Sequence, residues 1–382
     1  MDYVKYVNRE NLKIARENIG LDTLSASGKV TSTKKDVVSE WENGLSLPTW
    51  SQIIKLAKTY DVSEFLLLSE KIIKKNESVH DYRMLDKGVD KNKIKRLINL
   101  VISRQRWLEQ ILKGENRPKN LLQGIGNNIK DPEKLAHLIS ERLKISNEEI
   151  KEFKGLNSKK KVLDYLFKKA ENEGIFVGKT ISYHKLSVED MRGLFVSNDY
   201  CPYIIINRND SQNGQIFSFI HELAHLFRRS DSISNSLEFR NLKNINSEEI
   251  FCNKVAIELL LPKKEFTKTT YDGLDIRQLS DIYKVSEIAL FYRLKELGKI
   301  DPDSSFNLEN QIRIDMASNL ERKKELMNRR SESETKGGPN YIDLMRDSNG
   351  ELFNKFVAES YLENRISYVE ASNLLRFSVE KI

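Results

Sequence analysis

The stretch FSFIHELAHLF, Phe217 to Phe227, places His221, Glu222 and His225 in the order H-E-x-x-H within an otherwise apolar run. The chain has only five histidines among its 382 residues. Multiplying residue frequencies over such a chain gives roughly one chance match to the motif per 200 chains. A helix this apolar also needs a reason to bury polar side chains, because unpaired buried polar groups cost free energy.

Helical spacing predicts a metal site at this motif. Residues four apart share one face of a helix, so His221 and His225 can direct ring nitrogens at a single ion. Glu222 then lies beside the position of a bound water. A hydrolytic zinc site has three protein ligands and one open position, so a third ligand must come from elsewhere in the chain.

The segment SEEIFCNKVAIELLLP predicts a second strong helix, which ends at Pro262. We predict that Glu249 on this helix is the third ligand. The adjacent Glu248 stays an alternative. Asn253, one turn after Glu249, is placed to hydrogen-bond a ligand and fix its orientation.

The first 70 residues predict a compact module of short helices. The segments NLKIARENIG and KKDVVSEWENG close on Gly20 and Gly44, and WSQIIKLAKTY follows the turn LSLPT. The order W-E-N-G, L-P-T and L-A-x-x-Y-x-V resembles the helix-turn-helix of phage-repressor-type (XRE-like) regulators. This resemblance implies that Lys34, Lys35 and Ser39 lie in the major groove of DNA, near base edges.

A helical domain used for protein contacts is the alternative interpretation of this module. The stretch DTLSASGKVTS carries Ser and Gly where the first helix of the motif should have an apolar stripe. Residues 1–70 hold 9 Lys/Arg against 10 Asp/Glu, whereas affinity for nucleic acid comes largely from neutralising phosphates.

The basic surplus of the chain lies in residues 71–130, which hold 15 Lys/Arg against 6 Asp/Glu, a local excess of +9. Such a charge run is usually a solvated face, although it could add attraction to DNA or to an acidic partner. The segment KIKRLINLVISRQRWLEQIL predicts a helix with an apolar face of Ile94, Leu97, Ile98, Val101, Leu108 and Ile111.

From Asp131 onward the pattern changes to α+β. DPEKLAHLISERL and KKKVLDYLFKKAENEG predict helices, and GIFVGK, GLFVSN and PYIIINR predict short strands before the histidine helix. After Pro262, IRQLSDIYKVSEIALFYRLKELG predicts a helix, a turn and a helix, and RRSESETKGGPN predicts a polar linker. A small helical tail from Ile342 ends the chain.

We expect a soluble cytoplasmic protein with no membrane partner. No run of about 18 apolar residues exists to span a bilayer, and the N-terminal MDYVKYVNRE lacks the apolar centre of a signal peptide. In a reducing compartment Cys201 and Cys252 should be free thiols on small buried residues.

The combination of I-I-I-N, a glycine before the helix, H-E-L-A-H and E-x-x-C-N-x-x-A-x-x-L-L-x-P resembles the ImmA/IrrE family of zinc metallo-endopeptidases, a gluzincin-like group. The V-S-x-x-A-L-x-x-R-L and I-S-x-x-E-A-x-x-L-L elements resemble the longer members, which carry their own helix-turn-helix. The resemblance implies that His221, His225 and Glu249 bind Zn²⁺ and that Glu222 is the catalytic base. The E-x-x-C-N register favours Glu249 over Glu248.

The predicted fold class is α+β, with a gluzincin-like metalloprotease core that is mostly helical and carries a small sheet. An all-α helix-turn-helix domain precedes this core and helical elements follow it. The predicted segments are 1–70 (helix-turn-helix-like domain), 71–130 (basic helical linker region), 131–266 (zinc metalloprotease core), 267–330 (helix-turn-helix-like extension) and 331–382 (small C-terminal helical region).

The family resemblance implies an endopeptidase that cleaves one specific protein, a helix-turn-helix repressor, and so releases mobile-element or stress genes. Two alternatives stay open: the protease component of a toxin-antitoxin or phage-defence system, and a DNA-binding regulator with a structural metal site, to which Cys252 could add a thiolate. The expected partners are the protein substrate, DNA through the N-terminal domain, and a second copy in a homodimer. By residue type alone, Tyr183, His184 and Tyr203 could stabilise an oxyanion.

Overall fold

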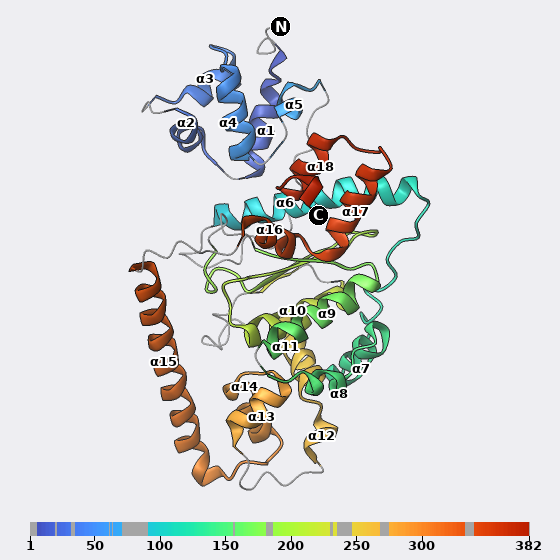
Figure 1. Cartoon of the computed structure of the whole chain (residues 1–382), viewed down its shortest axis with the longest axis vertical. Helices are drawn as coiled ribbons and strands as arrows, with labels where there is room; N and C mark the ends of the chain where they lie inside the picture. Colours follow the sequence, from blue (N-terminus) through green and yellow to red (C-terminus); the bar gives the residue numbers. More distant parts are fainter. Residues whose placement is uncertain are drawn as a thin grey trace. The chain divides into compact units, whose positions relative to one another are not determined.

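The computed structural model of the chain divides into two compact units, residues 1–115 with 182–190 and residues 116–181 with 191–382 (Figure 1). The predicted five-segment organisation is finer than this division and stays a prediction. Within the described ranges, no helix combines the length and the apolar character needed to cross a bilayer. The structure describes residues 6–19, 21–31, 35–60, 62, 64–70, 91–155, 157–180, 186–229, 232–234, 247–267, 275–332 and 340–381.

Helices build the first unit: α1 (Arg9–Asn18), α2 (Thr23–Val30), α3 (Val37–Asn43), α4 (Trp50–Tyr60), α5 (Glu64–Leu68) and α6 (Lys91–Gly114). The side chains of Asn8, Asp22 and Asp36 accept hydrogen bonds from backbone N–H groups in the first turns of α1, α2 and α3. These caps satisfy donors that a helix cannot pair internally. The predicted apolar face of α6 is confirmed, since Ile94, Leu97, Ile98, Val101 and Leu108 are buried and Ile111 is half-buried.

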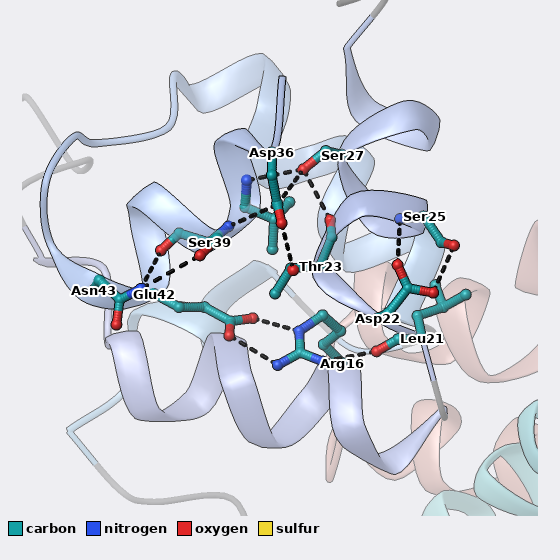
Figure 2. A network of polar contacts seen from close by, with 11 residues as sticks. Arg16, Leu21, Asp22, Thr23, Ser25, Ser27, Asp36, Ser39, Glu42 and Asn43 are labelled. Atoms are coloured by element: carbon teal, nitrogen blue, oxygen red, sulfur yellow. Dashed lines mark hydrogen bonds and ion pairs between the residues drawn. The ribbon is translucent and has the colours of Figure 1, made fainter. Parts of the chain in front are cut away.

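A polar network joins α2 to α3 at the place where the sequence lacks an apolar stripe (Figure 2). Ser27 is fully buried, and its hydroxyl lies 2.8 Å from the Thr23 carbonyl oxygen and 3.1 Å from Asp36 Oδ1. The same hydroxyl accepts a hydrogen bond from the backbone N–H of Val38 at 2.9 Å. The serine therefore replaces an apolar contact between the two helices by a satisfied hydrogen-bond network.

A four-stranded sheet with the order β1-β3-β2-β4 lies in the second unit. Its strands are β1 (Phe176–Lys179), β2 (Gly193–Val196), β3 (Tyr203–Ile206) and β4 (Ser232–Ser234). The first pairs with β3 in parallel, while β2 is antiparallel to both β3 and β4. All residues of β1, β2 and β3 are buried, as expected for apolar strands that are covered on both faces. These are the three predicted strands, and β4 was not predicted.

The second unit also contains the helices α7 (Pro132–Leu143), α8 (Asn147–Glu152), α9 (Ser158–Asn172), α10 (Gln212–Arg228), α11 (Ser247–Leu260), α12 (Lys263–Thr267), α13 (Ile276–Tyr283) and α14 (Glu287–Glu296). The helices α9, α10 and α11 lie on one side of the sheet in Figure 1. One apolar core unites residues from α7, α9, the strands, α10, α11, α13 and α14. Every residue from Phe219 to Phe227 is buried, so α10 lies at the centre of this core.

The C-terminal helices α15 (Pro302–Glu332), α16 (Tyr341–Asn349), α17 (Glu351–Leu362) and α18 (Tyr368–Leu375) complete the second unit. Asp347 attaches α16 to the sheet region, because its carboxylate lies 2.9 Å from Lys179 Nζ and 2.7 Å from Arg208 Nη2. At the start of α17, Glu171 of α9 accepts a hydrogen bond from the backbone N–H of Leu352 at 2.9 Å. A side chain from another helix therefore caps α17, whose own N-cap residue is Gly350 and has no side chain to do so. The predicted polar linker begins later than expected, since α15 continues to Glu332, and residues 333–339 lie outside the described residues.

Candidate metal centre

The helix α10 brings the H-E-x-x-H motif into the core. Its N-cap residue is Ser211, whose side chain accepts a hydrogen bond from the backbone N–H of Gly214 at 3.1 Å. His221, Glu222 and His225 are 3%, 0% and 1% exposed. Burial removes these three polar side chains from water, which costs free energy unless other groups bind them. Their neighbours therefore determine the chemistry of the cluster.

The two histidines and Glu249 of α11 converge on one point. The Nε2 atoms of His221 and His225 lie 3.0 Å apart. Glu249 Oε2 is 3.1 Å from His221 Nε2, and Glu249 Oε1 is 3.2 Å from His225 Nε2. Among the residues that the structure describes, these three form the only His, Cys, Asp or Glu group arranged to hold a metal ion.

This geometry fits zinc. Zinc bonds of about 2.0–2.1 Å in tetrahedral geometry place ligand atoms about 3.3 Å apart, close to the separations of 3.0 to 3.2 Å among these three side chains. The donor set of two imidazoles and one carboxylate is also one that zinc accepts in hydrolytic sites. Three ligands leave a fourth position for water or substrate.

Glu249 carries the negative charge of the cluster. Burial alone would raise its pKa, but hydrogen bonds from His221 and His225 outweigh burial and hold the pKa of Glu249 well below its usual value. The carboxylate is therefore ionised at neutral pH. An anionic oxygen aimed at two ring nitrogens provides a preformed site for a divalent cation.

Glu248, the alternative ligand, lies elsewhere. Its carboxylate pairs with Arg228 of α10 through two contacts of 2.8 and 2.9 Å. Arg228 also donates to the carbonyl oxygens of Asn127 and Ile129 at 3.0 and 2.8 Å. Consecutive helical residues point in different directions, so Glu248 fixes the start of α11 while Glu249 faces the histidines.

Glu222 lies against β2. A Cβ atom added at Gly193 would come within 2.5 Å of Glu222 Oε1 and 2.8 Å of its Cγ. Only glycine therefore lets the strand pass so close to the buried carboxylate. Sequence reasoning missed Gly193, and the only available signal was a glycine at the start of the predicted strand GLFV.

The remaining predicted residues around the site take other roles in the structure. Asn253 is half-buried on α11, and within the described residues no hydrogen bond joins it to His221, His225 or Glu249. The orienting role of Asn253 therefore stays a prediction. Nδ1 of His221 is buried and has no hydrogen-bond partner in the described part of the chain.

Cys252 does not join the metal-binding group. Both cysteines are free and buried, as predicted. Burial, followed by the neighbouring carboxylates, raises the pKa of the Cys252 thiol well above its usual value. Of the oxyanion candidates, Tyr203 donates its hydroxyl hydrogen bond to the Asn349 carbonyl oxygen at 3.1 Å, while Tyr183 and His184 lie outside the described residues.

The DNA-contact candidates lie at the start of α3, apart from Lys34, which is outside the described residues. Lys35 is exposed, and the backbone N–H of Ser39 donates to Asp36 Oδ1 at 3.1 Å. The helix itself carries Glu40 and Glu42 and no basic residue. A groove-reading role for α3 stays a prediction, and the charge of the helix opposes it.

Comparison with known families agrees with this geometry. Residues 177–295 match the model of the Peptidase M78 family, described as the IrrE N-terminal-like domain. The matched segment runs from β1 to α14 and contains His221, Glu222, His225 and Glu249. Searches of curated proteins and of solved structures found no match. Residues 177–295 are therefore similar to the peptidase domains of the ImmA/IrrE type, and the match includes the whole candidate metal centre.

Proposed function

We propose that the chain is a zinc-dependent endopeptidase whose substrate is one specific protein, a helix-turn-helix transcriptional repressor. The observation that carries the proposal is the convergence of His221, His225 and Glu249 within 3.0 to 3.2 Å beside the buried Glu222. The repressor as substrate rests on the resemblance of the sequence to the ImmA/IrrE family. Its cleavage would release mobile-element or stress genes from repression.

Each residue of the site has a separate role in peptide hydrolysis. A zinc ion held by His221, His225 and Glu249 would act as a Lewis acid on the scissile carbonyl and activate water. Glu222 accepts the proton of the attacking water as the new C–O bond forms. It then delivers that proton to the departing amine nitrogen as the C–N bond breaks. Gly193 keeps β2 close to Glu222 without a side chain between them, which holds the carboxylate in place for both transfers.

We favour hydrolysis over a structural metal site because of the ligand set. Structural zinc sites are usually closed by four Cys or His ligands, whereas this group has three members and one is a carboxylate. Cys252, the thiolate considered as a fourth ligand, is not part of the group. A role in a toxin-antitoxin or phage-defence system would use the same chemistry, with an antitoxin in place of the repressor.

Glu222→Gln tests the assignment of the base. The amide keeps the shape of the side chain but cannot accept the proton, so we expect zinc content to stay at the wild-type level and the cleavage rate to fall about 10² to 10⁴-fold. Metal content is measured by elemental analysis of the purified protein. Cleavage is followed by co-expression with each helix-turn-helix protein encoded beside this gene, read as loss of the intact protein.

Unchanged cleavage by Glu222→Gln would refute Glu222 as the base. Wild-type protein that holds zinc but leaves the neighbouring repressor intact would refute that protein as the substrate, and an antitoxin from the same locus would then be tested. Wild-type protein that binds zinc but cleaves no polypeptide would support the alternative, a regulator with a structural metal site. Glu359→Gln, an exposed carboxylate on α17, serves as the control that should change neither readout.

A further inference from the structure

We propose that a loop outside the family-matched segment holds the two ligand-bearing helices in register, and that Arg228 is the positioning residue of the metal centre. The loop, residues 122–129, precedes α7 and contacts the end of α10, so we call it the capping loop. The matched segment begins only at residue 177. The inference rests on the proposed metal centre, and its test measures metal binding without any cleavage assay.

The capping loop covers the C-terminal end of α10. The backbone N–H of Gly124 donates to the Leu226 carbonyl oxygen at 3.1 Å, and that of Gly126 donates to the Phe227 carbonyl oxygen at 2.8 Å. The last carbonyl groups of a helix find no complete set of partners within the helix, so another segment or water must supply them. Leu226 and Phe227 directly follow His225. The loop therefore fixes the turn of α10 that carries a metal ligand.

Gly126 lets the loop lie this close to the helix. A Cβ atom at Gly126 would lie 2.4 Å from Leu135 Cδ1 and 3.2 Å from the Phe227 carbonyl oxygen. Leu135 is fully buried, and close-packed neighbours leave it little room to move. A side chain at position 126 would therefore push the loop away from α10 and lengthen its hydrogen bond to Phe227.

Arg228 extends the contact from the loop to α11. Its guanidinium donates to the carbonyl oxygens of Asn127 and Ile129 in the capping loop at 3.0 and 2.8 Å. The same group binds both carboxylate oxygens of Glu248 at 2.8 and 2.9 Å, and its Cζ atom lies 4.7 Å from the ring centre of Phe251. A planar guanidinium holds several acceptors at fixed angles. One side chain of α10 thus joins the loop to the first turns of α11.

These contacts lie next to the metal ligands on both helices. Arg228 is three residues after His225, and Glu248 immediately precedes Glu249. The ligand atoms of α10 and α11 are 3.1 to 3.2 Å apart, and a shift of one helix along the other would separate them. Groups that hold metal ligands in place contribute about 10- to 100-fold to metal affinity. We therefore expect Arg228 to raise zinc affinity although it is not a ligand.

Substitution of Arg228 tests this expectation through the zinc Kd of the intact chain, measured by competition with a chelator. Arg228→Met keeps the length of the side chain but removes its polar contacts, so the Kd should rise about tenfold or more. Arg228→Lys keeps the charge, but one ammonium group cannot serve Glu248 and both carbonyl oxygens with the same geometry, so we expect a rise of about threefold. The matched control is Arg229→Met, which removes an exposed pair with Asp199 and should change the Kd less than about twofold.

Gly126→Ala tests the capping loop without changing any charge. The added methyl group should displace the loop from α10, and we expect the zinc Kd to rise about threefold, below the effect of removing Arg228 itself. Gly28→Ala is the matched control, because a Cβ atom at this position of α2 has no neighbour within 4 Å. It should leave the zinc Kd unchanged.

Cobalt(II) in place of zinc separates positioning from a purely structural role. The visible absorption of cobalt(II) depends on the geometry of its ligands. We expect the bands to change in Arg228→Met and to stay as in the wild type in Arg229→Met, whereas a purely structural role would lower stability and leave the bands of the folded protein unchanged. Thermal melts of the metal-free proteins show which variants are folded. If Arg228→Met does not fold, Arg228→Lys and Gly126→Ala decide the question.

The possible failures can be told apart. Folded variants of Arg228 with the zinc Kd and the cobalt spectrum of the wild type would overturn the positioning role and leave the metal centre intact. An unchanged Kd in Gly126→Ala would overturn the part assigned to the capping loop. A wild type that binds no zinc would refute the metal centre, and with it the proposed function.

Discussion

Two helix pairs in this protein bury polar side chains, and they do so in opposite ways. Between α2 and α3, Asp36 accepts hydrogen bonds from the hydroxyls of Thr23 and Ser27 at 2.6 and 3.1 Å, and from the Ser39 backbone N–H at 3.1 Å. Each of these polar groups has a hydrogen-bond partner within the network. Between α10 and α11, two imidazole nitrogens and a carboxylate point at a common centre.

The difference shows that saturation of hydrogen bonds, more than burial or charge, separates a structural cluster from a functional one. Burial raises and hydrogen bonds lower the pKa of both Asp36 and Glu249, and the net shift is downward in each. Asp36 reaches this state with fixed hydroxyl and amide donors, so it needs no further group. Glu249 reaches it with two ring nitrogens, whose protons a divalent cation would displace on binding.

The largest effect is expected from a substitution in the metal-binding group between α10 and α11. Glu249→Gln removes the anionic ligand, and we expect zinc affinity to fall at least about 100-fold, more than the loss that follows removal of a supporting group. Competition with a chelator measures this. Glu248→Gln is the matched control on the adjacent residue, because it removes the pair with Arg228 and should affect zinc affinity far less. A larger loss in Glu248→Gln would contradict the ligand assignment.

The next largest effect is expected from a substitution in the polar network between α2 and α3. Asp36→Ala leaves the buried Ser27 hydroxyl with fewer partners and uncaps α3, so we expect the free energy of unfolding to fall by about 2 kcal/mol. Urea denaturation of the intact chain measures this. Asp22→Ala removes the cap of α2, whose hydrogen bonds to Ser25 are exposed, and should destabilise less. An equal loss of unfolding free energy in the two variants would show that burial of the network does not contribute to stability.

A smaller effect concerns Glu171, a buried carboxyl outside both clusters. Burial raises the pKa of Glu171 to about 7 from the usual 4.5. Because the folded protein keeps the proton that the unfolded chain loses, the free energy of unfolding should fall as pH rises from about 4.5 to 7. The full shift corresponds to about 3 kcal/mol at most. Above pH 7 this contribution should be constant.

Glu171→Gln isolates this contribution. The difference in stability between wild type and variant should change across the window from about pH 5 to 7 and then level off. Glu359→Gln, an exposed carboxylate of α17, should give a difference that changes little with pH. A flat difference for Glu171→Gln would mean that the carboxyl titrates normally.

The sequence predicted the metal-binding group better than its surroundings, because helical spacing is a local property. His221 and His225 are four residues apart, and the choice of Glu249 followed from the register of a single helix. The supporting contacts are long-range: Gly193 lies on a strand, and Asp347 pairs with Lys179 across 168 positions of the chain. No spacing rule connects residues so far apart.

Predictions of the fold failed where local signals were weak or misleading. The three apolar strands were predicted, whereas β4 has only three residues in the sequence Ser-Ile-Ser and gives no alternation to detect. The missing apolar stripe of α2 weakened the resemblance to the helix-turn-helix motif, although the segment is helical. Ser27 satisfies its hydroxyl inside the network, and this compensation is visible only in three dimensions.

The packing of Gly350 restricts how an extended polypeptide can approach the sheet. A Cβ atom at Gly350 would lie 2.0 Å from the Val177 carbonyl oxygen, so the backbone between α16 and α17 touches the outer rim of β1. Beta-augmentation, in which a bound peptide adds itself as one more strand, is thereby blocked at that rim. An added strand could therefore not pair with β1 at this position.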